Sequence, residues 1–395
     1  MRRILIAGGI AQAASASSLL AQNILAPVLM GAESYGQAVA LVVLPFLSQG
    51  LLEPMVNGAA IAAEGRHERM EILRRSAKHL SICAPVIAVA SLLYGVTRHA
   101  SPAQSGLLVL FVGLVLINTG LRAIAFAGMR LRILAAHQLA ALAATFFALP
   151  LLWLSDVSGY LAMLCLVQMA VLFVLLWDQD VRQTAKTLLR TNQQTGHATP
   201  PLGSVYLANL SPRVTQLSLG PGMLMLASFQ LGAVQIAEFR ILQTLSGAIG
   251  YALPVNAPLM QAIARRTSRS HGPSMGTPIL IAAATTATAT ACIALWAIYP
   301  LIVNHLLQLN AASTQFRWLA PFAPLYALAP LLGGTLLGWG EKNFILYFNV
   351  IMAPSVIALG LTAGVGIGFA AGCILFALGL GWATLRVNHH DLETR

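Results

Sequence analysis

The chain has 395 residues, of which 57% are apolar and only 9% are charged, and its mean hydropathy is +0.76. A soluble domain carries about a quarter charged residues. Too few polar groups therefore remain to cover a water-exposed surface, so the composition predicts an all-α, polytopic membrane protein. The formal charge of +11 does not indicate nucleic-acid binding, because there are only 23 Lys and Arg and most stand between apolar segments.

Twelve apolar segments of membrane length follow one another, six on each side of a polar stretch near mid-chain. We expect a charged loop from Glu64 to Lys78 and a short turn at Ser155–Ser158. The twelve segments cover about 4–30, 35–63, 80–96, 106–129, 133–154, 159–177, 204–227, 232–260, 277–303, 316–339, 344–361 and 365–385.

The polar stretch divides the sequence into two halves. It is rich in Gln, Thr and Lys and holds the pair Pro200-Pro201. We therefore predict an N-terminal six-helix lobe at 1–178, a cytoplasmic linker at 179–203, and a C-terminal six-helix lobe with a short tail at 204–395.

Charge asymmetry predicts the orientation. With twelve spans, 18 of the 23 Lys and Arg fall on the side that holds both termini. Only Arg98 and Arg317 fall on the opposite side, and three Arg lie inside predicted helices. Because cytoplasmic loops carry the excess of Lys and Arg, both termini are expected in the cytoplasm.

A similar layout occurs once in each half. The stretch from Gly31 to Arg69 has a small-residue turn, an apolar helix interrupted by Pro54, and a basic exit. The stretch from Gly232 to Arg269 repeats this order, with Pro254 aligned to Pro54 after a one-residue gap. Repeats of this kind mark many transporters. The alternative is that any two membrane helices with Gly, Pro and a basic exit align this well.

Ionisable residues inside the predicted spans are the candidate functional groups. Each costs about 2.5–3.5 kcal/mol at the bilayer centre on insertion scales, so each is expected to face a cavity or a partner. Three arginines against two glutamates leave a small positive excess, which suits an anionic ligand such as a pyrophosphate. The five residues are Glu53, Arg122, Arg213, Glu238 and Arg240.

Arg213 belongs to a polar stripe in the seventh segment. Tyr206, Asn209, Arg213 and Gln216 are spaced to share one helix face. We interpret this stripe as a substrate-facing wall, because the five donors of an arginine are rarely all satisfied in an interhelical seam. The alternative is such a hydrogen-bonded seam.

A second stripe surrounds Glu53, with Gln49 and Asn57 at i−4 and i+4. Pro54 leaves the Gly50 carbonyl without its helical donor, so the stripe could hold a coupling proton or cation, or form a kinked seam. Arg122 is assigned to the substrate-binding residues, with snorkelling to the cytoplasmic side as the alternative. Arg240 either binds an anion or pairs with a neighbouring helix.

Cofactor and metal motifs are missing from the sequence. It contains no G-x-x-x-x-G-K-[ST], no H-E-x-x-H and no G-x-S-x-G element, and its four cysteines lie far apart in separate apolar segments. We therefore expect no ATP-driven engine in this chain, no enzyme activity, no cofactor and no metal site.

Several segments resemble the polysaccharide and O-antigen flippase branch of the multidrug/oligosaccharidyl-lipid/polysaccharide exporter superfamily. These segments are weakly specific, although the layout covers most of the chain. They are the G-x-x-x-Y-G turn of Gly31, Tyr35 and Gly36 with the apolar helix to Gly50, the run Glu238-Phe239-Arg240-Ile241-Leu242, and the segment Ala320 to Gly340.

The resemblance implies two six-helix lobes around a central cavity in the bacterial cytoplasmic membrane. The implied activity is flipping an undecaprenyl-pyrophosphate-linked oligosaccharide by alternating access, for surface polysaccharide synthesis. Arg213 and Arg240 would match the family's basic cavity. The implied partners are the lipid-linked oligosaccharide, membrane lipid and a polysaccharide polymerase with its chain-length machinery.

Three other functions remain open. A multidrug or small-molecule antiporter of the same superfamily would share the fold and could use Glu53 as its ion site, but Arg213 argues against a cationic drug. A polytopic polysaccharide polymerase or ligase would be expected to carry a large external loop, which is missing from the predicted topology. A membrane scaffold would leave the intramembrane Arg and Glu residues unexplained.

Overall fold

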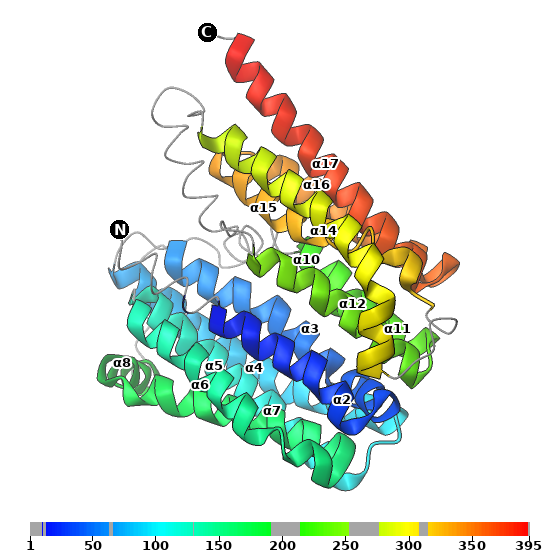
Figure 1. Ribbon diagram of the computed structural model, residues 1–395. Helices are drawn as coiled ribbons and strands as arrows, with labels where there is room; N and C mark the ends of the chain where they lie inside the picture. Colours follow the sequence, from blue (N-terminus) through cyan, green and yellow to red (C-terminus); the bar gives the residue numbers. More distant parts are fainter. Residues whose placement is uncertain are drawn as a thin grey trace. The chain divides into compact units, whose positions relative to one another are not determined.

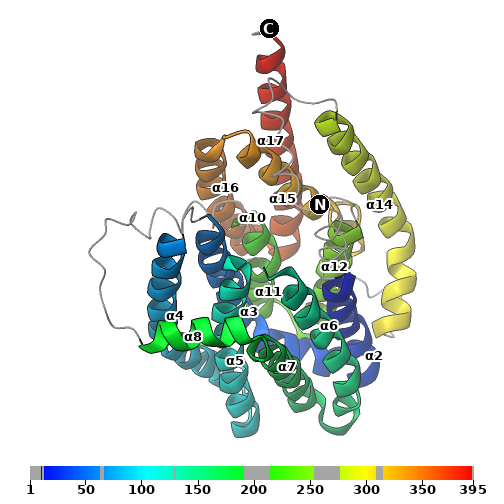
Figure 2. The same cartoon turned by 90° about the vertical axis from the view of Figure 1, so that its left-hand side faces the viewer.

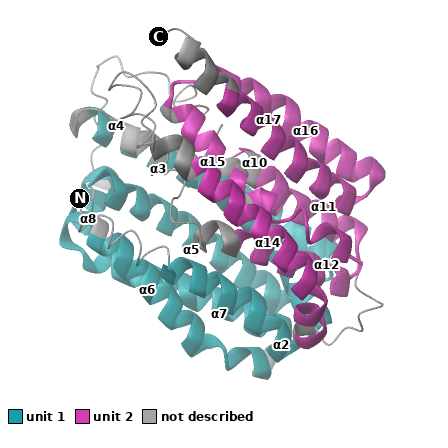
Figure 3. Cartoon of the chain, turned by 45° about the horizontal axis from the view of Figure 1, so that its top comes forward, with its two compact units in different colours: residues 1–210 teal, residues 211–395 magenta. Residues whose placement is uncertain are grey.

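The computed structural model describes residues 10, 13–62, 66–128, 130–190, 214–252, 276–307 and 315–393. The chain divides into two compact units, Met1–Leu210 and Ser211–Arg395 (Figure 3). All regular structure in the described residues is helical (Figure 1).

The described part of unit 1 holds six long helices and one short one. The first helix is continuous through Ala13–Met30 and includes a π-helical turn, η1 (Ala21–Leu25), which leads into α2 (Ala26–Met30). The others are α3 (Ala32–Ala62), α4 (Arg66–Thr97), α5 (Pro102–Ala127), α6 (Leu131–Ala148), α7 (Leu151–Trp177) and the short α8 (Gln179–Arg190).

Unit 2 begins, in the described residues, with one helical rod in three parts. These parts are α10 (Val214–Leu217), the π-helical turn η3 (Ser218–Gly222) and α11 (Met223–Gln230). The helices α12 (Ala233–Ala252), α14 (Gly276–Leu307), α15 (Leu325–Gly338), α16 (Lys342–Ala363) and α17 (Val365–Glu393) follow, with a 3-10 turn, η5 (Arg317–Leu319), before α15.

Eight of the helices in the described residues are long and apolar enough to cross a membrane. Their lipid-facing sides are apolar, as on α4, where Ile82, Val86, Val89 and Leu93 are all more than half exposed. Such an exposed apolar stripe is stable only in lipid. The expected all-α polytopic membrane fold is therefore confirmed.

The charged stretch before the third span differs from the expectation. We predicted a loop from Glu64 to Lys78, but α4 begins at Arg66 and contains most of that stretch. Glu71 pairs with Arg74 and Arg75 one turn further along the helix, at 3.4 and 2.9 Å, and Leu73 is buried in the core of unit 1. These i,i+3 and i,i+4 pairs and one buried apolar face extend the helix.

The turn expected at Ser155–Ser158 falls among residues assigned to α7, and the chain does reverse there. Asp156 has φ of 41°, and a Cβ on Gly159 would collide with the Leu151 backbone oxygen, although a straight helix would separate these residues by about 12 Å. The predicted start of the tenth span, in contrast, is wrong. The tenth span was expected from Phe316, but α15 begins only at Leu325, after Pro321 and Pro324 have interrupted regular helical bonding.

Two glycines allow the tight connection between α16 and α17. Gly364 joins the helices alone, with φ of 102°, a backbone conformation that favours glycine. Close to this turn, a Cβ on Gly368 would lie 2.6 Å from the Cα of Gly360. The glycine run at these positions therefore marks a close helix hairpin, as the sequence indicated.

The helix α8 occupies part of the sequence that we assigned to the linker. Its Val181 is buried in the hydrophobic core of unit 1, and Ala185 and Leu188 pack against the same core. Figure 2 shows α8 running across α4, α5 and α7, and all three of those helices contact it. Residues 191–203 of the predicted linker lie outside the described residues.

Candidate functional site

An ion pair lies inside unit 1. The Arg122 guanidinium on α5 donates to the Glu53 carboxylate on α3, with 3.1 Å between Nη1 and Oε1. The side chains are 11% and 26% exposed, respectively. Gln49, one turn before Glu53, reaches its other carboxylate oxygen at 3.5 Å, the outer limit for a hydrogen bond. The pair neutralises two of the intramembrane charges against each other.

Further polar groups surround this pair. The Asn118 amide, fully buried one turn before Arg122, donates to the backbone oxygen and the side-chain oxygen of Gln168 on α7, each at 2.8 Å. The Asn118 backbone oxygen accepts from Arg122 Nε at 3.4 Å. His137 on α6, only 3% exposed, interacts electrostatically with both Arg122 and Glu53. Four helices therefore contribute to one buried polar cluster.

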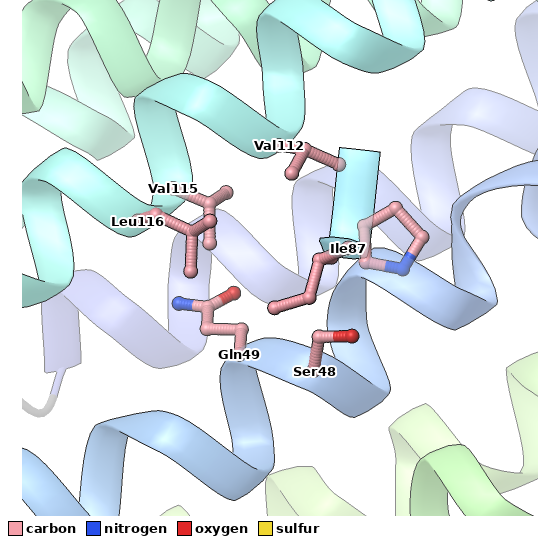
Figure 4. A pocket seen from close by; sticks show the side chains of 7 residues that line it. Ser48, Gln49, Ile87, Val112, Val115 and Leu116 are labelled. Atoms are coloured by element: carbon pink, nitrogen blue, oxygen red, sulfur yellow. The ribbon is translucent and has the colours of Figure 1, made fainter. Parts of the chain in front are cut away.

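A small pocket lies beside this cluster (Figure 4). The empty space between its lining atoms is about 160 Å³, but this volume includes open solvent. No interior space is large enough for a water molecule. Ser48 and Gln49 are its polar lining residues. The other lining residues are Pro45, Ile87, Val112, Val115 and Leu116. Because not even a water molecule fits inside it, this pocket cannot hold a sugar and is a packing gap between α3, α4 and α5.

The first helix of unit 1 is joined to its neighbours by polar side chains. Ser18 lies 2.9 Å from the Thr145 hydroxyl on α6, and Gln22 donates to both of these hydroxyls at 3.2 and 3.1 Å. The Tyr35 hydroxyl on α3 donates to the side chain of Asn23, which lies in the π-helical turn, at 2.8 Å. These bonds form an interhelical seam.

The first rod of unit 2 has a similar device. Pro221 lies in the π-helical turn η3 and lacks the backbone N–H that would bond the Leu217 oxygen in an α-helix. The Gln243 amide on α12 donates to the Leu219 and Gly220 oxygens at 2.8 and 3.0 Å. Gln243 is 5% exposed. In each unit, therefore, a side chain of the second helix bonds to the π-helical turn of the first helix.

Glu238 on α12 is the most heavily bonded acid of unit 2. It is 1% exposed, and Oε1 accepts hydrogen bonds from the Tyr299 hydroxyl at 3.1 Å and from the Phe316 N–H at 3.0 Å. The Gln315 N–H donates to Oε2 at 3.3 Å. Buried carboxylates need such donors. Glu238 therefore ties α12 to α14 and to the segment that leads into η5.

The predicted site residues are only partly visible in the structure. Arg213 and Asn209 lie outside the described residues. Gln216 lies in α10 and Asn57 in α3, with their backbones described but not their side chains. Arg240 is half-buried on α12. The structure brings Gln49, Glu53 and Arg122 together, so the predicted ion-coupling stripe and one predicted substrate-binding residue form a single cluster.

Sequence reasoning missed several residues of these clusters, namely His137, Thr145, Gln168, Gln243 and Tyr299. Each stands in a largely apolar helix, and nothing in its spacing points to the partner that it meets in the fold. In the part of the chain that the structure describes, no group of three His, Cys, Asp or Glu could hold a metal ion.

No family model matches the chain, and no curated protein matches it. Several solved structures match the chain. An inward-facing multidrug resistance MATE family transporter of the MOP superfamily has a TM-score of 0.66 at 14% identity, and the match covers 96% of this chain and 95% of the transporter chain. Lipid II flippase MurJ in an inward closed conformation has a TM-score of 0.66 at 10% identity. The match covers 99% of this chain and 91% of the MurJ chain. MATE in the straight conformation has a TM-score of 0.61 at 16% identity. The match covers 98% of this chain and 95% of the MATE chain.

Proposed function

We propose that this chain, which has the fold of MATE family transporters and of MurJ over nearly its full length, is a transporter of lipid-linked oligosaccharide. It would flip an undecaprenyl-pyrophosphate-linked repeat unit across the bacterial cytoplasmic membrane for surface polysaccharide synthesis. The name of one structural neighbour, a lipid II flippase, supports a lipid-linked substrate. The resemblance of the Gly31–Gly50 and Glu238–Leu242 segments to polysaccharide flippases supports an oligosaccharide.

The charge balance of the membrane interior carries this proposal. Glu53 and Arg122 neutralise each other, and the Glu238 carboxylate is satisfied by Tyr299 and two backbone N–H groups. The other two of the five residues that the sequence singled out are arginines, Arg240, which is half-buried on α12, and Arg213, which lies outside the described residues. Arginine binds phosphate groups through two parallel N–H donors. We assign Arg213 and Arg240 to the pyrophosphate, and Asn209 and Gln216 to neighbouring substrate hydroxyls.

The Glu53 cluster fits a coupling role better than substrate binding. Arg122, which we predicted to contact substrate, is engaged by Glu53 in this state. Protonation or cation binding at Glu53 would release Arg122, and Gln49 is placed to follow the change. We therefore propose that Glu53, Gln49 and Asn57 couple an ion gradient to the rocking of the lobes, with Arg122 as the charge that Glu53 releases.

A multidrug antiporter is the second candidate, because several of the matching structures are MATE transporters. A cationic drug would require an acidic, accessible cavity. Among the acids discussed above, Glu53 is paired with Arg122 and Glu238 is buried under three donors. This arrangement favours an anionic substrate.

A deletion strain tests the proposal. Its lipid-linked intermediates would be extracted and their leaflet determined, together with the amount of surface polysaccharide. Complete oligosaccharide units held on the cytoplasmic leaflet support the flippase. Units that reach the periplasmic leaflet but stay unpolymerised would indicate a polymerase or ligase. Normal polysaccharide with altered tolerance to toxic small molecules would indicate the antiporter.

A further inference from the structure

The short helix α8 is a fixed basic surface at the end of a membrane span. The Asp178 carboxylate begins it by accepting from the N–H groups of Asp180 and Val181, each at 3.0 Å. Asp180 forms an ion pair with Arg130, the residue before α6. Val181 is 1% exposed in the core of unit 1. The apolar face of α8 is therefore already covered by the protein, and the helix is held at both its first turn and its buried face.

The opposite side of α8 is cationic. Arg182 and Lys186 are one helical turn apart, so they lie on the same side of the helix, and both are exposed. The neighbouring exposed residues, Gln183 and Thr187, are neutral. The one described acid within the helix, Asp180, is engaged by Arg130. Asp178, one turn before Arg182 on the same side, is engaged by the first N–H groups of the helix. Arg182 and Lys186 are the exposed cations of this side.

The position of α8 along the membrane normal follows from the residues just before it. The apolar span Asp156–Trp177 ends one residue before α8. Trp177 is 74% exposed, and its ring lies 5.5 Å from that of the exposed Phe173. Exposed Trp residues at the end of a span occupy the headgroup level. Because α8 crosses the bundle rather than continuing along α7, its charges stay close to that level (Figure 2).

We propose that the face of α8 formed by Arg182 and Lys186 binds the headgroups of anionic phospholipids in the leaflet that contacts Trp177. The charges are complementary, and Arg182 follows Trp177 closely in the chain, in the first turns of α8. The face is thus a lipid-binding surface that lies outside the proposed substrate residues and does not depend on the nature of the transported substrate.

Brominated lipids test this binding through Trp177. The full-length chain would be reconstituted in phosphatidylcholine that contains increasing fractions of phosphatidylglycerol, with bromine on the acyl chains of one lipid at a time. The fluorescence of Trp177 is obtained as the difference between the protein and its Trp177→Phe variant. We expect phosphatidylglycerol to quench Trp177 at a lower mole fraction than phosphatidylcholine does. Added salt should reduce the difference.

Charge variants identify the residues responsible. Each of Arg182→Gln and Lys186→Gln should lower the preference for phosphatidylglycerol about fivefold, since a basic residue near an anionic surface contributes ~1 kcal/mol. The matched control Lys78→Gln/Arg132→Gln removes two exposed charges from α4 and α6 and should keep the preference. The charge-preserving Arg182→Lys/Lys186→Arg variant should also keep it.

Three results would overturn the proposal. The first is equal quenching by both lipids in the unaltered protein, which would point to an acidic protein partner or to water on this face. The second is an equal loss of preference in the control variant, which would show an effect of net charge alone. The third is an unchanged preference in Arg182→Gln/Lys186→Gln. Circular dichroism and gel filtration of every variant would exclude misfolding as the cause.

Discussion

Arg122 and Glu53 are 69 residues apart in sequence, yet their side chains form an ion pair 3.1 Å long between α5 and α3. Removing one partner of a largely buried pair leaves a charge without compensation, at a cost of about 3–5 kcal/mol at fully buried sites and less here. Arg122→Gln and Glu53→Gln should each lower the thermal unfolding temperature, and the double variant should recover part of the loss. Strictly additive shifts in unfolding temperature would show that the pair contributes no coupling.

Glu53→Gln also tests the proposed ion coupling. Glutamine keeps the shape of the side chain but cannot ionise, so transport should become less dependent on the proton or sodium gradient. Flipping of a fluorescent lipid-linked oligosaccharide in proteoliposomes, with and without an imposed gradient, measures this. If the response to the gradient is unchanged, Glu53 is purely structural.

Arg213→Ala should abolish export of surface glycan while the amount of protein in the membrane stays normal, because the pyrophosphate would lose a bidentate partner. Arg240→Ala should reduce export in the same way. Arg132→Ala removes an exposed arginine elsewhere and serves as the control. The amount of surface glycan measures export, and immunoblots of membranes measure the amount of protein. Normal glycan in Arg213→Ala would remove this residue from the site.

Glu238→Ala should destabilise unit 2 strongly. It would leave the Tyr299 hydroxyl and the N–H groups of Gln315 and Phe316 without their acceptor, and each buried unsatisfied group costs about 1–3 kcal/mol. Tyr299→Phe removes one donor and should cost about 1 kcal/mol. Glu33→Gln, at an exposed position, should have no effect. Thermal unfolding in detergent ranks the variants, and a Glu238→Ala protein as stable as Glu33→Gln would contradict the arrangement.

Gly368→Val should prevent close packing of α16 and α17. A Cβ at this position would lie 2.6 Å from the Cα of Gly360, so the helices must separate, and overpacking typically costs about 1–3 kcal/mol or more. Gly381→Ala, in the same helix but with open space around it, should be neutral or stabilising by up to about 1 kcal/mol. Yield and thermal unfolding temperature distinguish the two, and equal values would contradict the predicted close contact.

The sequence predicted the succession of helices well, because bilayer thickness sets the length of an apolar span. It failed where helix stability comes from contacts instead. The stretch that follows Arg66 is helical although it is charged, since Glu71 bridges two arginines and Leu73 reaches the core. The helix α8 is likewise stabilised by a core contact, because its Val181 is buried in the hydrophobic core of unit 1. Local polarity alone indicated loops at both places.

The sequence singled out the buried charged residues of the clusters but not their partners. The cost of burying charge was enough to single out Glu53, Arg122 and Glu238. Their partners come from distant segments: Arg122 from α5, and Tyr299 with Phe316 from residues far along the chain from Glu238. No spacing rule links such positions, because the packing of several helices decides which side chains meet.

The hairpin turns limit what an agent outside the cell could reach. On the side predicted to face outward, Gly31 and Gly364 each join two helices alone, and another pair of helical segments reverses direction at Asp156. A protease must bind an extended segment, so it would find almost nothing to cut at these turns. In intact cells, external digestion should therefore be slow at these turns and should favour the longer connections between α4 and α5 and between α14 and α15.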